Sequence, residues 1–185
     1  VLNGCIYIAA AIEAPGTIRM SGDIFRIVYG SLDGNVSDPL LLQVKTDLQD
    51  SGILPVYTDQ VRRDTFQKYA FVSPMAAAGA YYDAAAGDMK RPGKVRDLFV
   101  SCVREIDALA DAMGIPFPVD IMEEDLKIMD GLADDCTASM QKDLKKGGDS
   151  EADGLLREVV RMGEQYQVPT PSYRMVAEKV CGKME

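Results

Sequence analysis

The chain has 185 residues, of which 47% are hydrophobic and 26% charged, a balance typical of a globular protein with a buried core. Its formal charge is −9 and its 20 Lys and Arg residues are scattered, so we expect no nucleic-acid partner, because phosphate binding needs a basic face. No apolar run reaches the roughly 18 residues of a membrane span, and a basic signal-peptide start is absent, so we expect no membrane partner.

Residues 1–31 have the pattern of β-strands. A hydrophobic run at 5–8 leads to a turn at Pro15-Gly16, where Pro fixes φ and Gly accepts a positive φ. Two short β-rich runs follow at 17–20 and 25–29. Ser37-Asp38-Pro39 then predicts a helix start, and that helix should end before Gly52. A last short strand is expected at 53–57.

From residue 59 onward the pattern becomes helical. Gly114, followed by Pro116, predicts the end of a long helix. Further helices are expected near 119–131, 134–146, 151–166 and 171–181, and Ser150 is the expected cap of the helix at 151–166. The expected fold is mainly α, with a helical domain at 59–185 and a small β-rich piece at 1–58 that has the character of the end of an α/β domain. The buried face of the long helix is predicted from three-and-four spacing to contain Val95, Leu98, Phe99, Cys102, Ile106, Leu109 and Met113.

The chain contains no histidine. This excludes Ser–His–Asp and Cys–His nucleophile pairs and nearly all catalytic zinc sites, so we expect no metal. Proton transfer must then fall to Lys, Tyr, Asp, Glu or Cys. The four cysteines lie far apart without a C-x-x-C pair, which favours reduced thiols in a cytoplasmic protein over disulfides or metal ligands.

Lys68 is the best candidate for a catalytic group. Helical spacing places it near Val61, Thr65 and Val72, where a lysine either extends its amine to water or points into a cleft. Glu151 follows Ser150 in the expected first turn of a helix, where a carboxylate is favoured by the helix dipole whatever its function. No G-x-G-x-x-G or P-loop pattern that would hold a pyrophosphate occurs in the chain.

Several motifs resemble those of the ketopantoate reductase (2-dehydropantoate 2-reductase) family. The strand sequences YIAA at 7–10 and IEAPGTIR at 12–19 resemble the last strands of its nucleotide-binding domain. DTFQKY at 64–69 resembles the helix that has an aromatic residue two places before a catalytic lysine. EAD at 151–153, VVRMG at 159–163 and VPTP at 168–171 match the family's C-terminal signature, and Ser139 lies at the expected distance ahead of it.

The resemblance implies a Rossmann-type remnant at 1–58 and a helical domain, similar to the C-terminal domain of 6-phosphogluconate dehydrogenase, at 59–185. It implies an NADPH-dependent oxidoreductase that reduces a 2-keto acid, in pantothenate and coenzyme A biosynthesis, with a possible homodimer. By this analogy Lys68 and Glu151 are catalytic, Glu151 also contacts the cofactor, and Ser139 binds substrate. The domain that binds most of the NADPH would lie upstream of Val1, so we expect the chain alone to be inactive.

The chain departs from the family at three positions where an asparagine is usual. These are Val72 and Ala76, four and eight places after Lys68, and Leu156, five places after Glu151. Losing three amides removes hydrogen bonds that would orient a polar substrate, which favours a 2-keto acid more apolar than ketopantoate. Two alternatives stay open: a non-catalytic helical module for dimerisation or partner binding, and the helical domain of another hydroxyacid dehydrogenase family.

Overall fold

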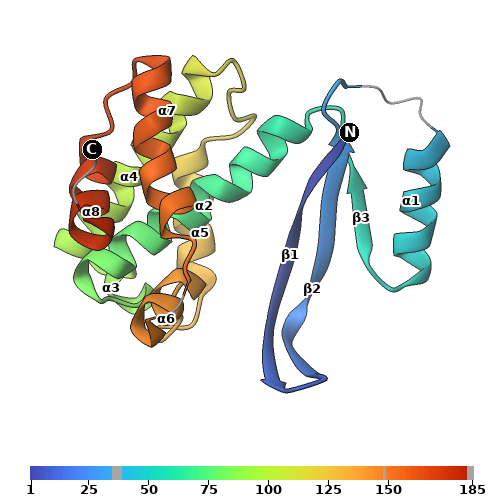
Figure 1. Cartoon of the computed structure of the whole chain (residues 1–185), viewed down its shortest axis with the longest axis horizontal. Coiled ribbons are helices and arrows are strands. Elements are labelled where there is room, and N and C mark those ends of the chain that lie inside the picture. Colours follow the sequence, from blue (N-terminus) through green and yellow to red (C-terminus); the bar gives the residue numbers. More distant parts are fainter. Residues whose placement is uncertain (35–38, 148, 183–185) are drawn as a thin grey trace. The chain divides into compact units, whose positions relative to one another are not determined.

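A computed structural model of the chain describes residues 1–34, 39–147 and 149–182. The chain divides into two compact units, Val1–Phe66 and Gln67–Glu185. The first contains a small sheet and the second is helical, so the mainly α fold with a β-rich N-terminal part is confirmed (Figure 1). The assignment of 1–58 to a nucleotide-binding domain and 59–185 to a substrate domain stays a prediction.

The first unit is built on a three-stranded sheet in the order β1-β2-β3. Strands β1 (Leu2–Ala14) and β2 (Thr17–Ser31) are antiparallel, while β3 (Leu54–Tyr57) runs parallel to β2. Helix α1 (Pro39–Asp50) connects β2 to β3, as a parallel pair requires (Figure 1). The runs expected at 17–20 and 25–29 form one continuous strand. The residues between them are accommodated by a register shift in the pairing with β1, opposite residues 8–10.

Helix α1 is held on the sheet by a buried contact. The Tyr29 hydroxyl donates a hydrogen bond of 2.8 Å to the carbonyl of Leu41, which is itself buried. The helix ends at Asp50, before Gly52, as the sequence predicts. Gly52 has a φ of 77°, a positive value that glycine accepts easily after a helix. The predicted cap residues Ser37 and Asp38 lie outside the described residues.

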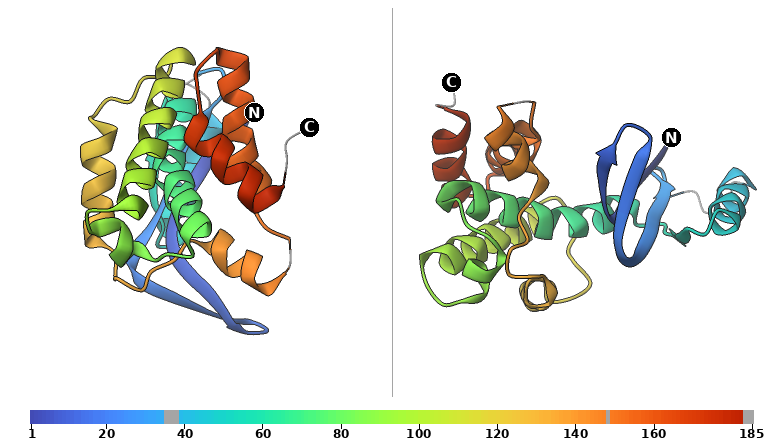
Figure 2. Two further views of the ribbon diagram at one scale, coloured as in Figure 1. Left: turned by 90° about the vertical axis from the view of Figure 1, so that its left-hand side faces the viewer. Right: turned by 90° about the horizontal axis from the view of Figure 1, so that it is seen from below.

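The second unit contains the remaining helices (Figures 1 and 2). Helix α2 begins before the boundary of this unit, and η1, a π-helix, leads directly into α7. Of the residues described, no helix is both long and apolar enough to cross a membrane. The elements are α2 (Val61–Tyr82), α3 (Ala86–Lys90), α4 (Lys94–Ala112), α5 (Ile121–Gly131), α6 (Ser139–Lys146), η1 (Asp153–Arg157), α7 (Glu158–Tyr166) and α8 (Pro171–Cys181).

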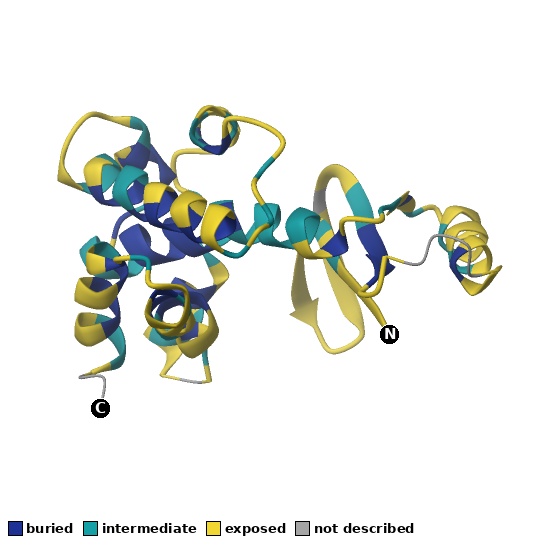
Figure 3. Cartoon of the chain, turned by 90° about the horizontal axis from the view of Figure 1, so that it is seen from above, coloured by how far each residue is buried: buried dark blue, intermediate teal, exposed yellow. Residues whose placement is uncertain are grey.

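Helix α4 supplies much of the core of this unit. The spacing prediction holds for five of its seven residues, which are buried, while Val95 and Met113 at the two ends are half-buried. The helix ends as predicted, with Gly114 at φ of 73° just beyond it. The five buried residues are Leu98, Phe99, Cys102, Ile106 and Leu109. Figure 3 shows that the helices have buried faces and exposed faces.

Two local features are unusual. Helix α2 contains Pro74 and continues to Tyr82, although proline leaves the carbonyl four residues earlier without its usual N–H. The helix expected from 151 begins as η1 with Ala152 at its N-cap, so Ser150 is not the cap. At Pro74 the residues on both sides, Ser73 and Met75, are buried, so packing outweighs the local signal there.

Candidate functional site

Lys68 lies on α2, in the half-buried stretch before the fully buried part of that helix. The next residue, Tyr69, donates a hydrogen bond of 2.7 Å from its hydroxyl to the carbonyl of Gly154 in η1. Burial is the main reason why the pKa of Tyr69 is raised, and the carboxylate of Glu158 raises it further. This bond attaches the turn of α2 that carries Lys68 to η1.

One turn further along α2, Ser73 makes a second connection. Its side chain is fully buried, and its Oγ donates a 2.7 Å hydrogen bond to the carbonyl of Leu155. The hydroxyl of Tyr173 from α8, also fully buried, lies 2.7 Å from the same Oγ. Burial raises the pKa of Tyr173 well above its ordinary value, and Cys102 and Tyr69 add to the effect. Three hydroxyls therefore join α2, η1 and α8.

Glu151 lies exposed in the turn before η1. Its carbonyl accepts a 2.8 Å hydrogen bond from the N–H of Leu155, the residue that Ser73 contacts. The structure therefore brings the two predicted catalytic residues, 83 positions apart in sequence, onto segments that are hydrogen-bonded to each other. Their catalytic roles stay predictions.

The junction of η1 and α7 is fixed by ion pairs. Arg161 donates two hydrogen bonds, of 3.0 and 2.8 Å, to the carboxylate of Asp153, and a third of 2.6 Å to Glu158. The hydrogen bonds from Arg161 hold the pKa of Asp153 below its ordinary value. Bidentate pairing of this kind restricts orientation more than a single contact does.

Ser139 lies on α6, whereas Lys68 lies on α2 and Glu151 lies before η1. It is exposed at the first residue of α6, after the N-cap Ala138. The helix is anchored by Gln141, which accepts from the N–H of Ala138 at 3.2 Å and donates to the carbonyl of Ala84 at 3.0 Å. The substrate-binding role of Ser139 stays a prediction.

The three positions that depart from the family pattern are occupied by apolar residues, two of them in the core. Ala76 and Leu156 are fully buried and Val72 is half-buried. Their side chains contribute apolar packing and have no polar group to offer a substrate.

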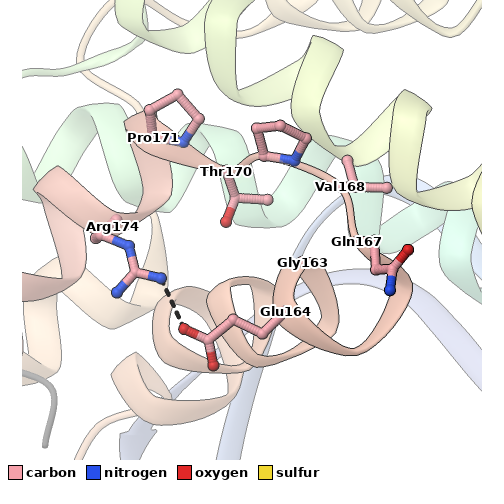
Figure 4. Close-up of a pocket in the computed structure, with 8 residues that line it drawn as sticks. Gly163, Glu164, Gln167, Val168, Thr170, Pro171 and Arg174 are labelled. Carbon is pink, nitrogen blue, oxygen red and sulfur yellow. Dashed lines mark hydrogen bonds and ion pairs between the residues drawn. The ribbon is translucent and has the colours of Figure 1, made fainter.

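A pocket of about 440 Å³ lies between α7 and α8 (Figure 4), and Lys68, Glu151 and Ser139 are not among the residues that line it. Arg174 and Glu164 form an ion pair of 2.7 Å across it. Its walls come from the end of α7 and the segment 167–171, which contains the VPTP motif. We assign this pocket no role in the chemistry of Lys68.

Glu105 is a structural carboxylate that the sequence reasoning missed. It is buried on α4, and its two oxygens accept hydrogen bonds of 2.8 and 3.1 Å from the N–H groups of Ser172 and Tyr173, in the first turn of α8. It thereby satisfies N–H groups that have no partner within the helix. The sequence feature that could have identified Glu105 is its position between Cys102 and Leu109 on the apolar face of α4.

Within the described ranges, no group of three or more His, Cys, Asp or Glu side chains is arranged to hold a metal ion. The four cysteines, all of which lie in those ranges, form no disulfide with one another.

Comparison with known proteins gives one family match and several relatives of similar fold. Residues 60–183 match the family described as "Ketopantoate reductase PanE/ApbA C terminal". A 2-dehydropantoate 2-reductase of Aquifex aeolicus (strain VF5) is 23% identical over 187 residues, covering 99% of this chain and 60% of the relative. The chain therefore spans about three-fifths of the length of that relative.

Solved structures share the fold at low sequence identity. A 2-dehydropantoate 2-reductase from Methylococcus capsulatus has a TM-score of 0.85 at 22% identity, covering 97% of this chain and 57% of that one. A D-mandelate dehydrogenase bound to NADH and anilino(oxo)acetate has a TM-score of 0.84 at 20% identity, with coverages of 97% and 59%. A ketopantoate reductase from Staphylococcus aureus, described as dimeric, has a TM-score of 0.83 at 17% identity, with coverages of 97% and 60%.

Proposed function

The chain belongs to the ketopantoate reductase family, because residues 60–183 match the C-terminal domain of that family. From this membership we propose that the protein is an NADPH-dependent oxidoreductase that reduces a 2-keto acid to the 2-hydroxy acid. One observation carries the proposal. The helical turn of Lys68 and the turn of Glu151 are joined through the Tyr69–Gly154 hydrogen bond, so an ammonium and a carboxylate are supplied from adjoining segments.

In the proposed reaction, Lys68 acts as the general acid. NADPH, when bound, supplies the hydride that adds to C2 of the keto acid. Lys68 donates a proton from Nζ to the carbonyl oxygen as negative charge develops there, and the neutral amine regains a proton from solvent. Glu151 is exposed, and a carboxylate is able to accept hydrogen bonds, which suits it to the hydroxyls of a nicotinamide ribose or to orienting Lys68.

Most of the NADPH is held, in this proposal, by the nucleotide-binding domain that the family resemblance implies, so residues 1–185 alone are inactive. The preference for NADPH over NADH, the cytoplasmic location and the homodimer belong to the same proposal. The dimeric relative from Staphylococcus aureus supports the last of these. A place in pantothenate biosynthesis belongs to the proposal only for ketopantoate, the substrate that the family resemblance implies.

We further propose that the substrate is more apolar than ketopantoate. Val72, Ala76 and Leu156 supply packing where three amides are usual in the family, and two of the three are fully buried. A ketone with a hydrocarbon substituent loses little from the absence of those amides, whereas a hydroxyl-bearing one loses its hydrogen bonds. The D-mandelate dehydrogenase of similar fold, bound to the aromatic oxo acid anilino(oxo)acetate, supports this choice.

The test uses the protein as its gene encodes it, including any sequence that precedes Val1. Oxidation of NADPH and of NADH is measured with ketopantoate, a branched aliphatic 2-keto acid and an aryl 2-keto acid. We expect turnover, with kcat/KM higher for the more apolar acids. A folded protein that oxidises neither cofactor with any of them supports the non-catalytic module for dimerisation or partner binding instead.

The first variant is Lys68→Met, which keeps most of the apolar stem of the lysine and removes its ammonium. We expect kcat to fall by about 10² to 10⁴ because the general acid is lost, while the melting temperature changes little. Lys127→Met, at an exposed lysine of α5, is the matched control and should leave kcat unchanged. If Lys68→Met alters only stability, then Lys68 extends to water and takes no part in catalysis.

A further inference from the structure

We propose that Tyr69, Ser73 and Tyr173 are positioning residues, whose hydroxyls hold η1, and with it Glu151, in register with the helix that carries Lys68. This inference rests on the proposed function for its effect on turnover. The mechanical part of it, that these hydroxyls hold η1, stands on the hydrogen bonds of the second unit alone.

The π-helical turn explains why η1 needs partners from outside. The N–H of Glu158 bonds to the carbonyl of Asp153, five residues earlier, rather than to that of Gly154, four residues earlier. The carbonyl of Gly154 thereby loses the partner it would have in an α-helix. Tyr69 donates to that carbonyl at 2.7 Å. The tyrosine hydroxyl therefore supplies a hydrogen bond to the carbonyl that the π-helical turn leaves without its α-helical partner.

The direction of each hydrogen bond follows from the protons available. Ser73 has one hydroxyl proton, which goes to the carbonyl of Leu155. The bond between Ser73 and Tyr173 must then be donated by Tyr173. Burial raises the pKa of both Tyr69 and Tyr173, so both phenols keep their protons and remain donors at neutral pH.

The same network fixes the backbone of Glu151. Leu155 is held at its carbonyl by Ser73 and at its N–H by the carbonyl of Glu151, at 2.8 Å. A shift of η1 along α2 would break the bonds at Gly154 and Leu155 together. Since Lys68 immediately precedes Tyr69, such a shift would also change the position of Glu151 relative to Lys68, and small misplacements of catalytic groups reduce rates strongly.

The experiment removes single hydroxyls by Tyr69→Phe and Tyr173→Phe. Tyr82→Phe, at the opposite end of α2, is the matched control. Amide hydrogen exchange is followed in residues 1–185 by peptides that cover 151–158 and, as an internal reference, α4. We expect exchange at 155–158 to become roughly fivefold to tenfold faster in both variants, the effect of one net hydrogen bond, with α4 unchanged.

In the full-length enzyme, both variants should lower kcat several-fold and change KM less, while Tyr82→Phe changes neither. Unchanged exchange at 155–158, or an equal rise in α4, overturns the inference, because the hydroxyls then hold nothing local. Faster local exchange in an enzyme with unaltered kcat also overturns it. If the wild-type protein reduces no 2-keto acid, the proposed function fails, and the exchange measurement still decides whether these hydroxyls position η1.

Discussion

Buried carboxylates in the helical unit differ in whether they have partners. Glu105 is buried with both oxygens accepting backbone N–H groups. Asp125 of α5 is only 1% exposed, and its Oδ2 has no hydrogen-bond partner among the described residues. Burial, with the nearby carboxylates of Glu124 and Asp107, raises the pKa of Asp125 to about 7. The folded protein therefore binds a proton at Asp125 that the unfolded chain releases at lower pH.

The raised pKa of Asp125 predicts a pH-dependent loss of stability. Because the folded state binds the proton more tightly, the stability is present below the unfolded pKa of about 4 and declines as the pH rises towards 7. We expect Asp125→Asn, which stays neutral, to raise the free energy of unfolding at pH 8 by roughly 1 to 4 kcal/mol and much less at pH 4.

Urea unfolding of both proteins at the two pH values measures this difference. Asp130→Asn, at an exposed acid of the same helix, is the control and should show no such pH dependence. An Asp125→Asn protein that gains equal stability at both pH values would contradict the protonation argument.

At the scale of elements, the C-terminal signature is explained by close packing of α7 against the segment that precedes α8. A Cβ built on Gly163 would lie 2.8 Å from the Thr170 Oγ1 and 2.8 Å from the carbonyl of Val168. The N–H of Val168 also bonds to the carbonyl of Gly163 at 2.9 Å. VVRMG and VPTP are therefore the two sides of one contact, which positions α8 and with it Tyr173.

Gly163→Ala should destabilise the helical unit. The added methyl group meets backbone and a buried side chain at less than normal contact distance, so we expect a loss of about 1 to 3 kcal/mol in the free energy of unfolding. Gly131→Ala at the end of α5 is the control, because nothing lies within 4 Å of its Cβ. The control should be neutral or slightly stabilising, since alanine favours helix. Equal effects of the two substitutions in denaturant unfolding would refute the close-packing explanation.

At the scale of the whole molecule, the two units differ in how well they bury apolar side chains. The helical unit has a continuous core, whereas the β1–β2 ribbon is exposed over most of its length (Figure 3). Ile12 is 79% exposed, and it is opposite Ile18, also exposed. Apolar strands with free edges can pair with another chain.

Residues 1–185 should therefore associate with themselves in a concentration-dependent way. Ile12→Lys places a charge on the exposed ribbon and should shift the protein towards monomer, because a charged side chain disfavours strand pairing. Val119→Lys, at an exposed apolar residue of the helical unit, should leave association unchanged. Sedimentation velocity over a range of concentrations measures the association of the wild-type chain and of both variants. A wild-type chain that stays monomeric at every concentration would contradict the prediction.

The sequence by itself determined the class of fold, the position of most helices and the family. Three-and-four spacing identified the buried face of α4 because helix periodicity depends only on local geometry. Gly52 and Gly114 marked helix ends for the same reason, since only a few residue types accept a positive φ. The candidates Lys68 and Glu151 came from residue chemistry and from motifs that are short and contiguous.

Only the tertiary structure decided how those candidates are connected. The partnership of Tyr69 and Ser73 with η1 joins residues more than 80 positions apart, and no local pattern specifies such a pairing. The π-helical start of α7, the passage of α2 through Pro74 and the capping of α8 by Glu105 are likewise set by packing and by buried polar groups that need partners. These requirements depend on the complete set of neighbours, which exists only once the chain has folded.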